Sequence, residues 1–215
     1  MILKNYKKIV IKIGSTTIVD QFSGKLKTKW LHSICEDIVK LVNSNKKIAI
    51  VSSGAIALGK NLISIHKPIK RLEDKQAAAA IGQIELAKHW QQALKKYKIN
   101  TAQLLLTLND SEERRRYLNA RKTITSLHNK KVIPIINEND TVATEEIRYG
   151  DNDRLAARVA QMMGANLLVL LSDIDGLYTA NPYINKQAKR ISNIKIIDEM
   201  IEMMAGKNLS IFGSG

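Results

Sequence analysis

The sequence predicts an α/β fold whose central sheet is mainly parallel and is covered on both faces by helices. Short apolar runs rich in β-branched residues alternate along the chain with longer segments whose apolar residues have helical spacing. The expected strands span residues 8–13, 47–51, 102–107, 132–136 and 167–171, and the expected helices span residues 28–43, 75–97, 112–128 and 153–163. Ligands bind beyond the carboxyl ends of parallel strands, so these ends are the candidate sites.

Each expected strand is bounded by polar or turn-forming residues. The five runs end, in order, at a glycine, at Ser-Ser-Gly, at Asn-Asp, at Asn-Glu-Asn-Asp and at Ser-Asp. We expect the first three runs to be buried strands. Segment 64–74, which carries Pro68 and several charges, is expected to form an exposed loop, and segment 145–149 a short strand of a hairpin.

Size, charge and cysteine content narrow the class of protein. The chain has 215 residues, 45% of them hydrophobic, and no repeat or Pro/Gly/Ser-rich linker divides it, so we expect one domain over residues 1–215. Its net charge of +14 favours an anionic partner but does not choose among nucleic acid, membrane surface and small molecule. The single cysteine, Cys35, fits a reducing compartment, and no apolar run is long enough to cross a membrane. We therefore expect a cytoplasmic protein without a membrane partner.

Lys12 and Gly14 mark the end of the first strand. A lysine near the end of an apolar strand, followed by a glycine that allows close approach of the backbone, suits a phosphate. A surface lysine on an edge strand explains these two residues equally well.

Two serines and a glycine follow the second strand. Ser52, Ser53 and Gly54 open an apolar segment, where hydroxyls and free N–H groups at a helix N-terminus would bind an anion. Capping of that helix by serine is the alternative. The run from Gly54 to Lys60 nearly matches the phosphate-binding loop G-x-x-x-x-G-K-[ST]. We reject that match because Asn61 replaces the required hydroxyl residue and the intervening residues are apolar.

Two clusters of asparagine and acidic residues lie at further strand ends. Residues 137–140 read Asn-Glu-Asn-Asp and residues 150–153 read Gly-Asp-Asn-Asp. Helix capping would be enough to explain Asp151 alone. Together, the carboxamides and carboxylates favour binding of the α-amino group of a zwitterionic substrate.

Ser172 and Asp173 follow the most apolar strand, residues 167–171. They would order a nucleotide loop or bind a metal; the alternative is that they form an Asx turn.

Taken together, these motifs resemble the amino acid kinase superfamily, and within it most closely the glutamate 5-kinase family. The resemblance rests on residues 12–15 (KIGS), 51–57 (VSSGAIA), 118–121 (LNAR), 134–140 (PIINEND), 150–153 (GDND) and 176–182 (GLYTANP). It implies a three-layer α/β/α sandwich, the amino acid kinase fold, here apparently truncated inside a glycine loop at its C-terminus. The implied activity is transfer of the ATP γ-phosphoryl group to the side-chain carboxylate of L-glutamate, with Mg²⁺, as the first step of proline biosynthesis.

The resemblance also implies roles for individual residues. Lys12 would bridge phosphates and Asp153 would orient it. The glutamate-binding positions would be Ser53, Asp140 and Asn152, and the nucleotide-binding positions Lys12, Gly14, Ser172, Asp173, Ser214 and Gly215. No metal ligand is assigned. The family resemblance further implies a homo-oligomer, a dimer or tetramer. With only 5% aromatic residues and no evident stacking platform, we do not expect a nucleic-acid partner. The alternative function is that of a catalytically inactive family member that acts as a binding or oligomerisation subunit.

Overall fold

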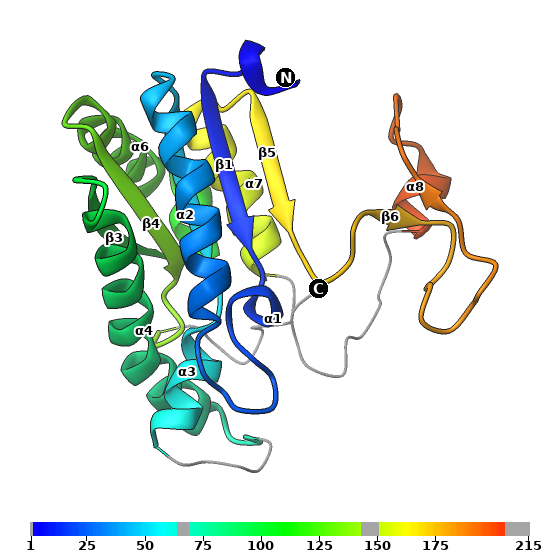
Figure 1. Cartoon of the computed structure of the whole chain (residues 1–215), viewed down its shortest axis with the longest axis horizontal. Coiled ribbons are helices and arrows are strands. Elements are labelled where there is room, and N and C mark those ends of the chain that lie inside the picture. Colours follow the sequence, from blue (N-terminus) through cyan, green and yellow to red (C-terminus); the bar gives the residue numbers. More distant parts are fainter. Residues whose placement is uncertain (1, 64–68, 143–150, 205–215) are drawn as a thin grey trace.

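In the computed structural model, a five-stranded parallel sheet lies between two layers of helices (Figure 1). The structure describes residues 2–63, 69–142 and 151–204. The strands are β1 (Lys8–Ile13), β2 (Lys47–Ser52), β3 (Asn100–Leu106), β4 (Val132–Glu138) and β5 (Leu167–Leu171), in the order β3-β4-β2-β1-β5. Every pairing in this sheet is parallel, so all five carboxyl ends lie at one edge. The expected α/β/α architecture is confirmed.

The helices divide between the two faces of the sheet. One layer contains α2 (Thr28–Asn43), α3 (Ala55–Leu62) and α4 (Leu72–Lys95), and the other contains α6 (Arg114–Asn129) and α7 (Asp151–Met163). Alternate side chains of β1 supply both cores. Ile9, Ile11 and Ile13 pack in the cluster that includes Trp90 of α4, whereas Val10 packs in the cluster that includes α7.

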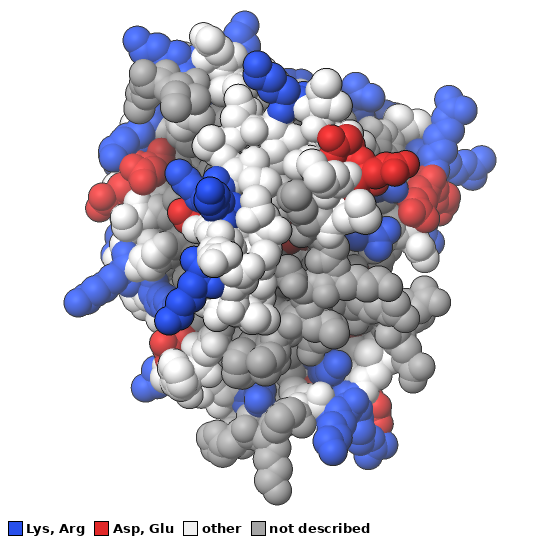
Figure 2. All heavy atoms as spheres, turned by 90° about the vertical axis from the view of Figure 1, so that its right-hand side faces the viewer, with Lys and Arg blue, Asp and Glu red and all other residues white. Residues whose placement is uncertain are grey.

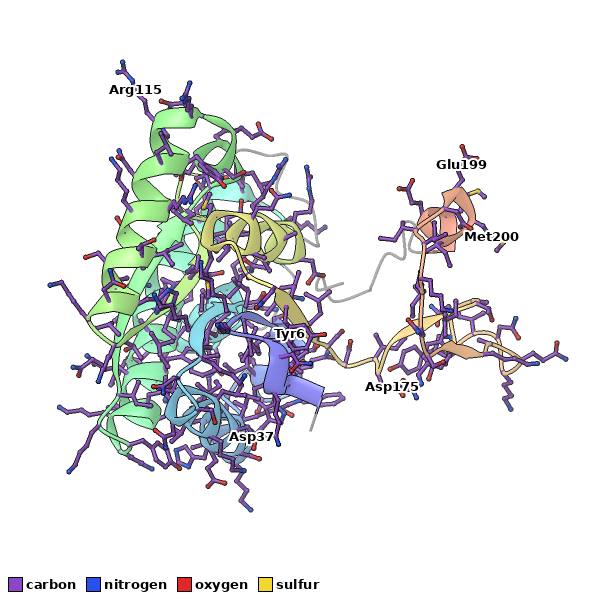
Figure 3. The ribbon with its side chains drawn as sticks, turned by 90° about the horizontal axis from the view of Figure 1, so that it is seen from above. Tyr6, Asp37, Arg115, Asp175, Glu199 and Met200 are labelled. Atoms are coloured by element: carbon purple, nitrogen blue, oxygen red, sulfur yellow. The ribbon has the colours of Figure 1, made fainter. Side chains whose placement is uncertain are left out.

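The remaining elements are short. They are a 3-10 helix, η1 (Ile2–Asn5), together with α1 (Ser15–Ile18), α5 (Leu108–Glu112), β6 (Leu177–Tyr178), β7 (Arg190–Ile191) and α8 (Glu199–Met204). The antiparallel β6–β7 pair and α8 form an arm to one side of the sheet. Figure 3 shows Asp175, Glu199 and Met200 on this arm, apart from the helical layers. Within the described parts of the chain, no helix is both long and apolar enough to span a bilayer.

The structure corrects three expectations. Helix α4 begins at Leu72, so residues 72–74 are helical rather than part of a loop; the acidic pair Glu73 and Asp74 lies in its first turn, where the helix dipole favours negative charge. The expected helix 112–128 is preceded by a separate turn, α5, because Thr107 and Asp110 form a reciprocal capping box. Strand β3 is a sheet edge, so most of its residues are only half-buried or exposed. Residues 64–68 and the expected hairpin strand 145–149 lie outside the described residues.

Helices α3 and α4 cross at two glycines. A Cβ atom added to Gly59 would lie 1.8 Å from the carbonyl oxygen of Ala78, and one added to Gly82 would lie 1.8 Å from that of Ala55. Gly59 therefore serves helix packing inside α3 and not a phosphate loop, in agreement with the rejection of the G-x-x-x-x-G-K-[ST] match.

The crossing predicts that Gly82→Ala destabilises the protein. In an open helix the substitution would stabilise by about 1 kcal/mol. Here the clash with backbone atoms should outweigh that gain and cost about 1–3 kcal/mol or more, measured by urea denaturation. Ala80→Gly, at an exposed position of the same helix, is the matched control for helix propensity. A Gly82→Ala variant as stable as the wild type would contradict the close crossing.

His128 predicts a pH dependence of stability at the opposite edge of the sheet. Its Nε2 lies 2.9 Å from the carbonyl oxygen of Ile48, and burial lowers the pKa of the imidazole despite this contact, with Lys47 and Lys8 adding repulsion. The imidazole of His128 therefore takes up a proton more readily in the unfolded chain than in the folded chain. The free energy of unfolding decreases as the pH falls below 6.5. His128→Gln should flatten the stability profile between pH 7.5 and 5.5 in urea titrations. An unchanged slope would rule this assignment out.

Candidate functional site

The parallel register brings the ends of neighbouring strands together. Ile13 is aligned with Ser52 on β2 and with Leu171 on β5, and Val51 is aligned with Ile136 on β4. Backbone hydrogen bonds continue this alignment past the strands: the N–H of Gly14 donates to Leu171 O at 3.0 Å, and that of Ser53 donates to Ile13 O at 3.0 Å. The polar segments predicted at separate positions in the sequence therefore begin side by side.

A buried ion pair lies at the carboxyl end of β1. Lys12 follows Val10 by two residues on β1, so its side chain points to the layer that contains α7. Its ammonium Nζ lies 2.8 Å from Asp153 Oδ1, and the two side chains are 3% and 33% exposed. β1 has a strand on each side, so the interpretation of Lys12 as a surface lysine on an edge strand is wrong. A Cβ atom on Gly14 would lie 3.7 Å from Nζ, which places the ammonium group beside the backbone of Gly14.

A series of side-chain hydrogen bonds links α7, β4, α4 and the turn after β2 beside this ion pair. Asn152, the neighbour of Asp153 at the start of α7, donates from Nδ2 to Ser53 Oγ at 2.8 Å and to Asn137 Oδ1 at 3.1 Å. Asn137 at the end of β4 donates from Nδ2 to Oε1 of Gln83 on α4 at 2.6 Å. Asn137 and Gln83 are 2% and 9% exposed. Two of the three predicted glutamate-binding residues, Ser53 and Asn152, thus lie in contact.

Sequence reasoning missed two members of this series of hydrogen bonds. Asn137 lies inside the PIINEND motif but received no role of its own. Gln83 belongs to no motif. The one signal for it is a polar residue next to Gly82 on the buried side of a helix that otherwise presents alanine, leucine and tryptophan to the core.

The turn after β2 is shaped by glycine, not by serine capping. Gly54 is the N-cap of α3 with φ of 109°, a left-handed conformation that favours glycine, and no side chain caps this helix. Ser52 has a different task, because its Oγ accepts a hydrogen bond from Trp90 Nε1 at 3.0 Å. The alternative that serine caps α3 is therefore wrong, and Ser53 Oγ instead accepts a hydrogen bond from Asn152.

The remaining predicted residues lie beyond β4 and β5. Asp140 is half-buried in the turn that follows β4, where the N–H of Asn139 donates to Leu106 O at 2.9 Å. Ser172 directly follows Leu171, the residue bonded to Gly14, and donates from Oγ to Oδ1 of the exposed Asp173 at 3.1 Å. Ser214 and Gly215 lie outside the described residues.

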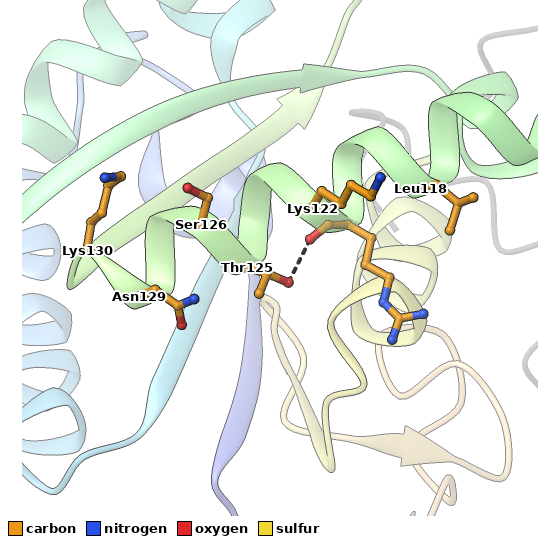
Figure 4. A pocket seen from close by; sticks show the side chains of 7 residues that line it. Leu118, Lys122, Thr125, Ser126, Asn129 and Lys130 are labelled. Carbon is orange, nitrogen blue, oxygen red and sulfur yellow. Dashed lines mark hydrogen bonds between the residues drawn. The ribbon is translucent and has the colours of Figure 1, made fainter.

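A shallow hollow of about 720 Å³ lies elsewhere, on α6 (Figure 4). Its lining residues all belong to this helix or its C-cap: Leu118, Arg121, Lys122, Thr125, Ser126, Asn129 and Lys130. None of the predicted site residues lines it. On the face seen in Figure 2, Lys and Arg are scattered among acidic and uncharged side chains and form no continuous stripe. The described part of this one face therefore carries no basic stripe that would suit a nucleic acid.

The ion pair predicts unequal effects of removing its two members. Asp153→Asn leaves the ammonium of Lys12 buried without its carboxylate. The expected loss is about 3–5 kcal/mol for a fully buried pair, and nearer the lower end here because Asp153 is 33% exposed. Lys12→Met should cost less, since it removes the more deeply buried charge. Urea denaturation of both variants measures the difference. A smaller loss for Asp153→Asn than for Lys12→Met would contradict the burial of this charge.

Comparisons with known proteins identify relatives of this chain by sequence. The chain is 56% identical over 213 residues to "Glutamate 5-kinase" of Allorhizobium ampelinum, covering 99% of this chain and 54% of that protein. It is 57% identical to "Glutamate 5-kinase 1" of Mesorhizobium japonicum, covering 99% and 56%. The chain thus spans about half the length of the curated relatives it matches.

A solved structure and a family model complete the comparison. The crystal structure of UMP kinase from Bacillus anthracis matches with a TM-score of 0.58 at 17% identity, covering 93% of this chain and 83% of that one, which is a likeness of fold alone. The model of the amino acid kinase family matches residues 7–214. The chain therefore belongs to the amino acid kinase family.

Proposed function

We propose that this chain acts as a glutamate 5-kinase. It transfers the γ-phosphoryl group of ATP to the side-chain carboxylate of L-glutamate and yields L-glutamyl 5-phosphate and ADP, the first step of proline biosynthesis. The observation that carries the proposal is the buried Lys12–Asp153 ion pair directly beside the amide and hydroxyl groups of Asn152 and Ser53. The identity of 56–57% with glutamate 5-kinases supports the choice of substrate.

The polar groups beside the ion pair suit an amino acid. Asn152 Oδ1 is buried and accepts no hydrogen bond within the part of the chain that the structure describes. A buried acceptor requires a donor, and an α-ammonium group carries three N–H donors. Ser53 and Asp140 complete the proposed glutamate-binding set. Asp140 supplies negative charge for the ammonium group from the turn after β4.

Lys12 would act on the phosphoryl group during transfer. The attacking carboxylate is already ionised at neutral pH, so the reaction requires no general base. Its main demands are alignment of the reactants and neutralisation of charge on the transferred group. An ammonium held in place by Asp153 inside a low-dielectric edge of the sheet meets the second demand without reorganising during the reaction.

The nucleotide would lie along the ends of β1 and β5. The N–H of Gly14 donates to Leu171 O, and Ser172 and Asp173 follow Leu171 in the sequence. We propose all three as nucleotide contacts, together with Ser214 and Gly215. Among the described residues, no three His, Cys, Asp or Glu side chains are grouped to hold a metal ion. Bound to the phosphates of ATP, Mg²⁺ would share the neutralisation of their charge. We further propose a cytoplasmic homo-oligomer with a single domain over residues 1–215.

The proposed function predicts binding and turnover by the purified chain. Titration calorimetry should show binding of L-glutamate and of ATP with Mg²⁺. ADP release should depend on glutamate, and hydroxylamine should trap the acyl phosphate as a hydroxamate. Lys12→Ala should retain glutamate binding and lose at least about 10²-fold in rate, by analogy with loss of one charge-stabilising group.

The possible outcomes separate the two proposed roles. Absence of binding for both ligands would refute the kinase assignment. Binding of glutamate and ATP without ADP release would favour the alternative, an inactive family member that serves as a binding or oligomerisation subunit. An unchanged rate in Lys12→Ala would remove the role assigned to that residue.

A further inference from the structure

Gln83 lies at the inner end of the hydrogen-bond chain that leads to the proposed glutamate site. Its side chain projects from α4 and is 9% exposed. Oε1 accepts a hydrogen bond of 2.6 Å from Asn137 Nδ2, whereas Nε2 has no hydrogen-bond partner within the described residues. The preceding residue, Gly82, lies in the close crossing of α3 and α4. This helix packing holds the backbone beside Gln83, where the series of hydrogen bonds begins.

The hydrogen bonds of the two asparagine amides run in one direction, and the first of them ends at the acceptor on Gln83. Because Asn137 directs its Nδ2 to Gln83, its Oδ1 faces Asn152 and accepts at 3.1 Å. Asn152 then uses both hydrogens of Nδ2, one for Asn137 and one for Ser53 Oγ at 2.8 Å. Its Oδ1 is buried and has no hydrogen-bond partner among the described residues.

We propose that Gln83 is a positioning residue that sets the polarity of this amide chain, so that Asn152 presents an oxygen, and not an NH₂ group, to the α-ammonium group of the substrate. This inference rests on the proposed function and deepens it, because it assigns selection of an amino acid over the corresponding dicarboxylic acid. Without an acceptor at position 83, Asn137 can rotate its amide by half a turn. Asn152 would then be free to rotate as well and to direct N–H donors at a cation.

The test compares L-glutamate with glutarate, which has the same carbon chain and both carboxylates but no amino group. Calorimetry on the wild type should give tighter binding of L-glutamate. Gln83→Met, similar in shape but without the oxygen acceptor, should weaken L-glutamate binding about 10- to 100-fold, the range for a lost hydrogen bond to a charged group. Its affinities for glutarate and for ATP should change much less.

Gln83→Glu provides the conservative rescue. Its carboxylate keeps an acceptor for Asn137, and the Nε2 that it replaces makes no hydrogen bond among the described residues. This variant should keep the preference for L-glutamate. Gln92→Met, at an exposed position of the same helix, is the matched control and should behave as the wild type. If Gln83→Met fails to fold by circular dichroism, Asn137→Leu breaks the same chain one link later and should lose the same preference.

Each outcome decides between the two claims. A wild type that prefers L-glutamate, with an equal preference in Gln83→Met, would overturn the role of Gln83 and leave the proposed function standing. Equal losses of L-glutamate and glutarate affinity, or loss of the preference in Gln83→Glu, would also overturn it, because they indicate a merely structural role. A wild type that binds neither acid would overturn the proposed function, and this inference with it.

Discussion

The burial of one lysine charge inside a parallel sheet constrains the whole site. The ammonium group of Lys12 lies at the carboxyl end of β1 with only 3% of its side chain exposed, so an anion must lie next to it. Asp153 meets that requirement and ties the first turn of α7 to the sheet. Asn152 precedes Asp153 in the same turn and is thereby directed at Ser53 and Asn137. The first turn of α7 therefore holds Lys12, which is proposed to stabilise a phosphate, and also contributes Asn152 to the proposed amino-acid site.

A second constraint comes from the opposite helical layer. The crossing of α3 and α4 at Gly59 and Gly82 brings the two helix backbones close together. It fixes the direction of α3, whose N-terminus follows Ser53, and the position of Gln83. The amide chain therefore runs from one helical layer to the other across the edge of the sheet. Its four residues come from segments as far apart as 99 positions in the sequence, which only the parallel strand order brings into contact.

Much of this architecture can be predicted from residue patterns. Strands β1 and β5 and helix α2 occupy the expected residues, because their apolar spacing and polar ends are unambiguous. Whether a strand is central or at an edge cannot be predicted in this way. The apolar runs of β3 and β5 resemble central strands, yet both are edges of the five-stranded sheet, and Leu170 is 52% exposed. Likewise, the charged residues before position 75 suggested a loop, but two of them favour the first turn of α4.

The candidate site shows the same division. The motifs at strand ends predicted Lys12, Ser53, Asn152 and Asp153, which the structure brings together. They did not predict Gln83, because its role depends on a helix crossing and not on a local pattern.

The most direct measurement of the central claim is a crystal structure of the chain with L-glutamate and a non-hydrolysable ATP analogue. We predict Lys12 Nζ in contact with the γ-phosphoryl group and Asn152 Oδ1 in contact with the amino group of glutamate. Ligands bound elsewhere, for example in the hollow on α6, would contradict the account.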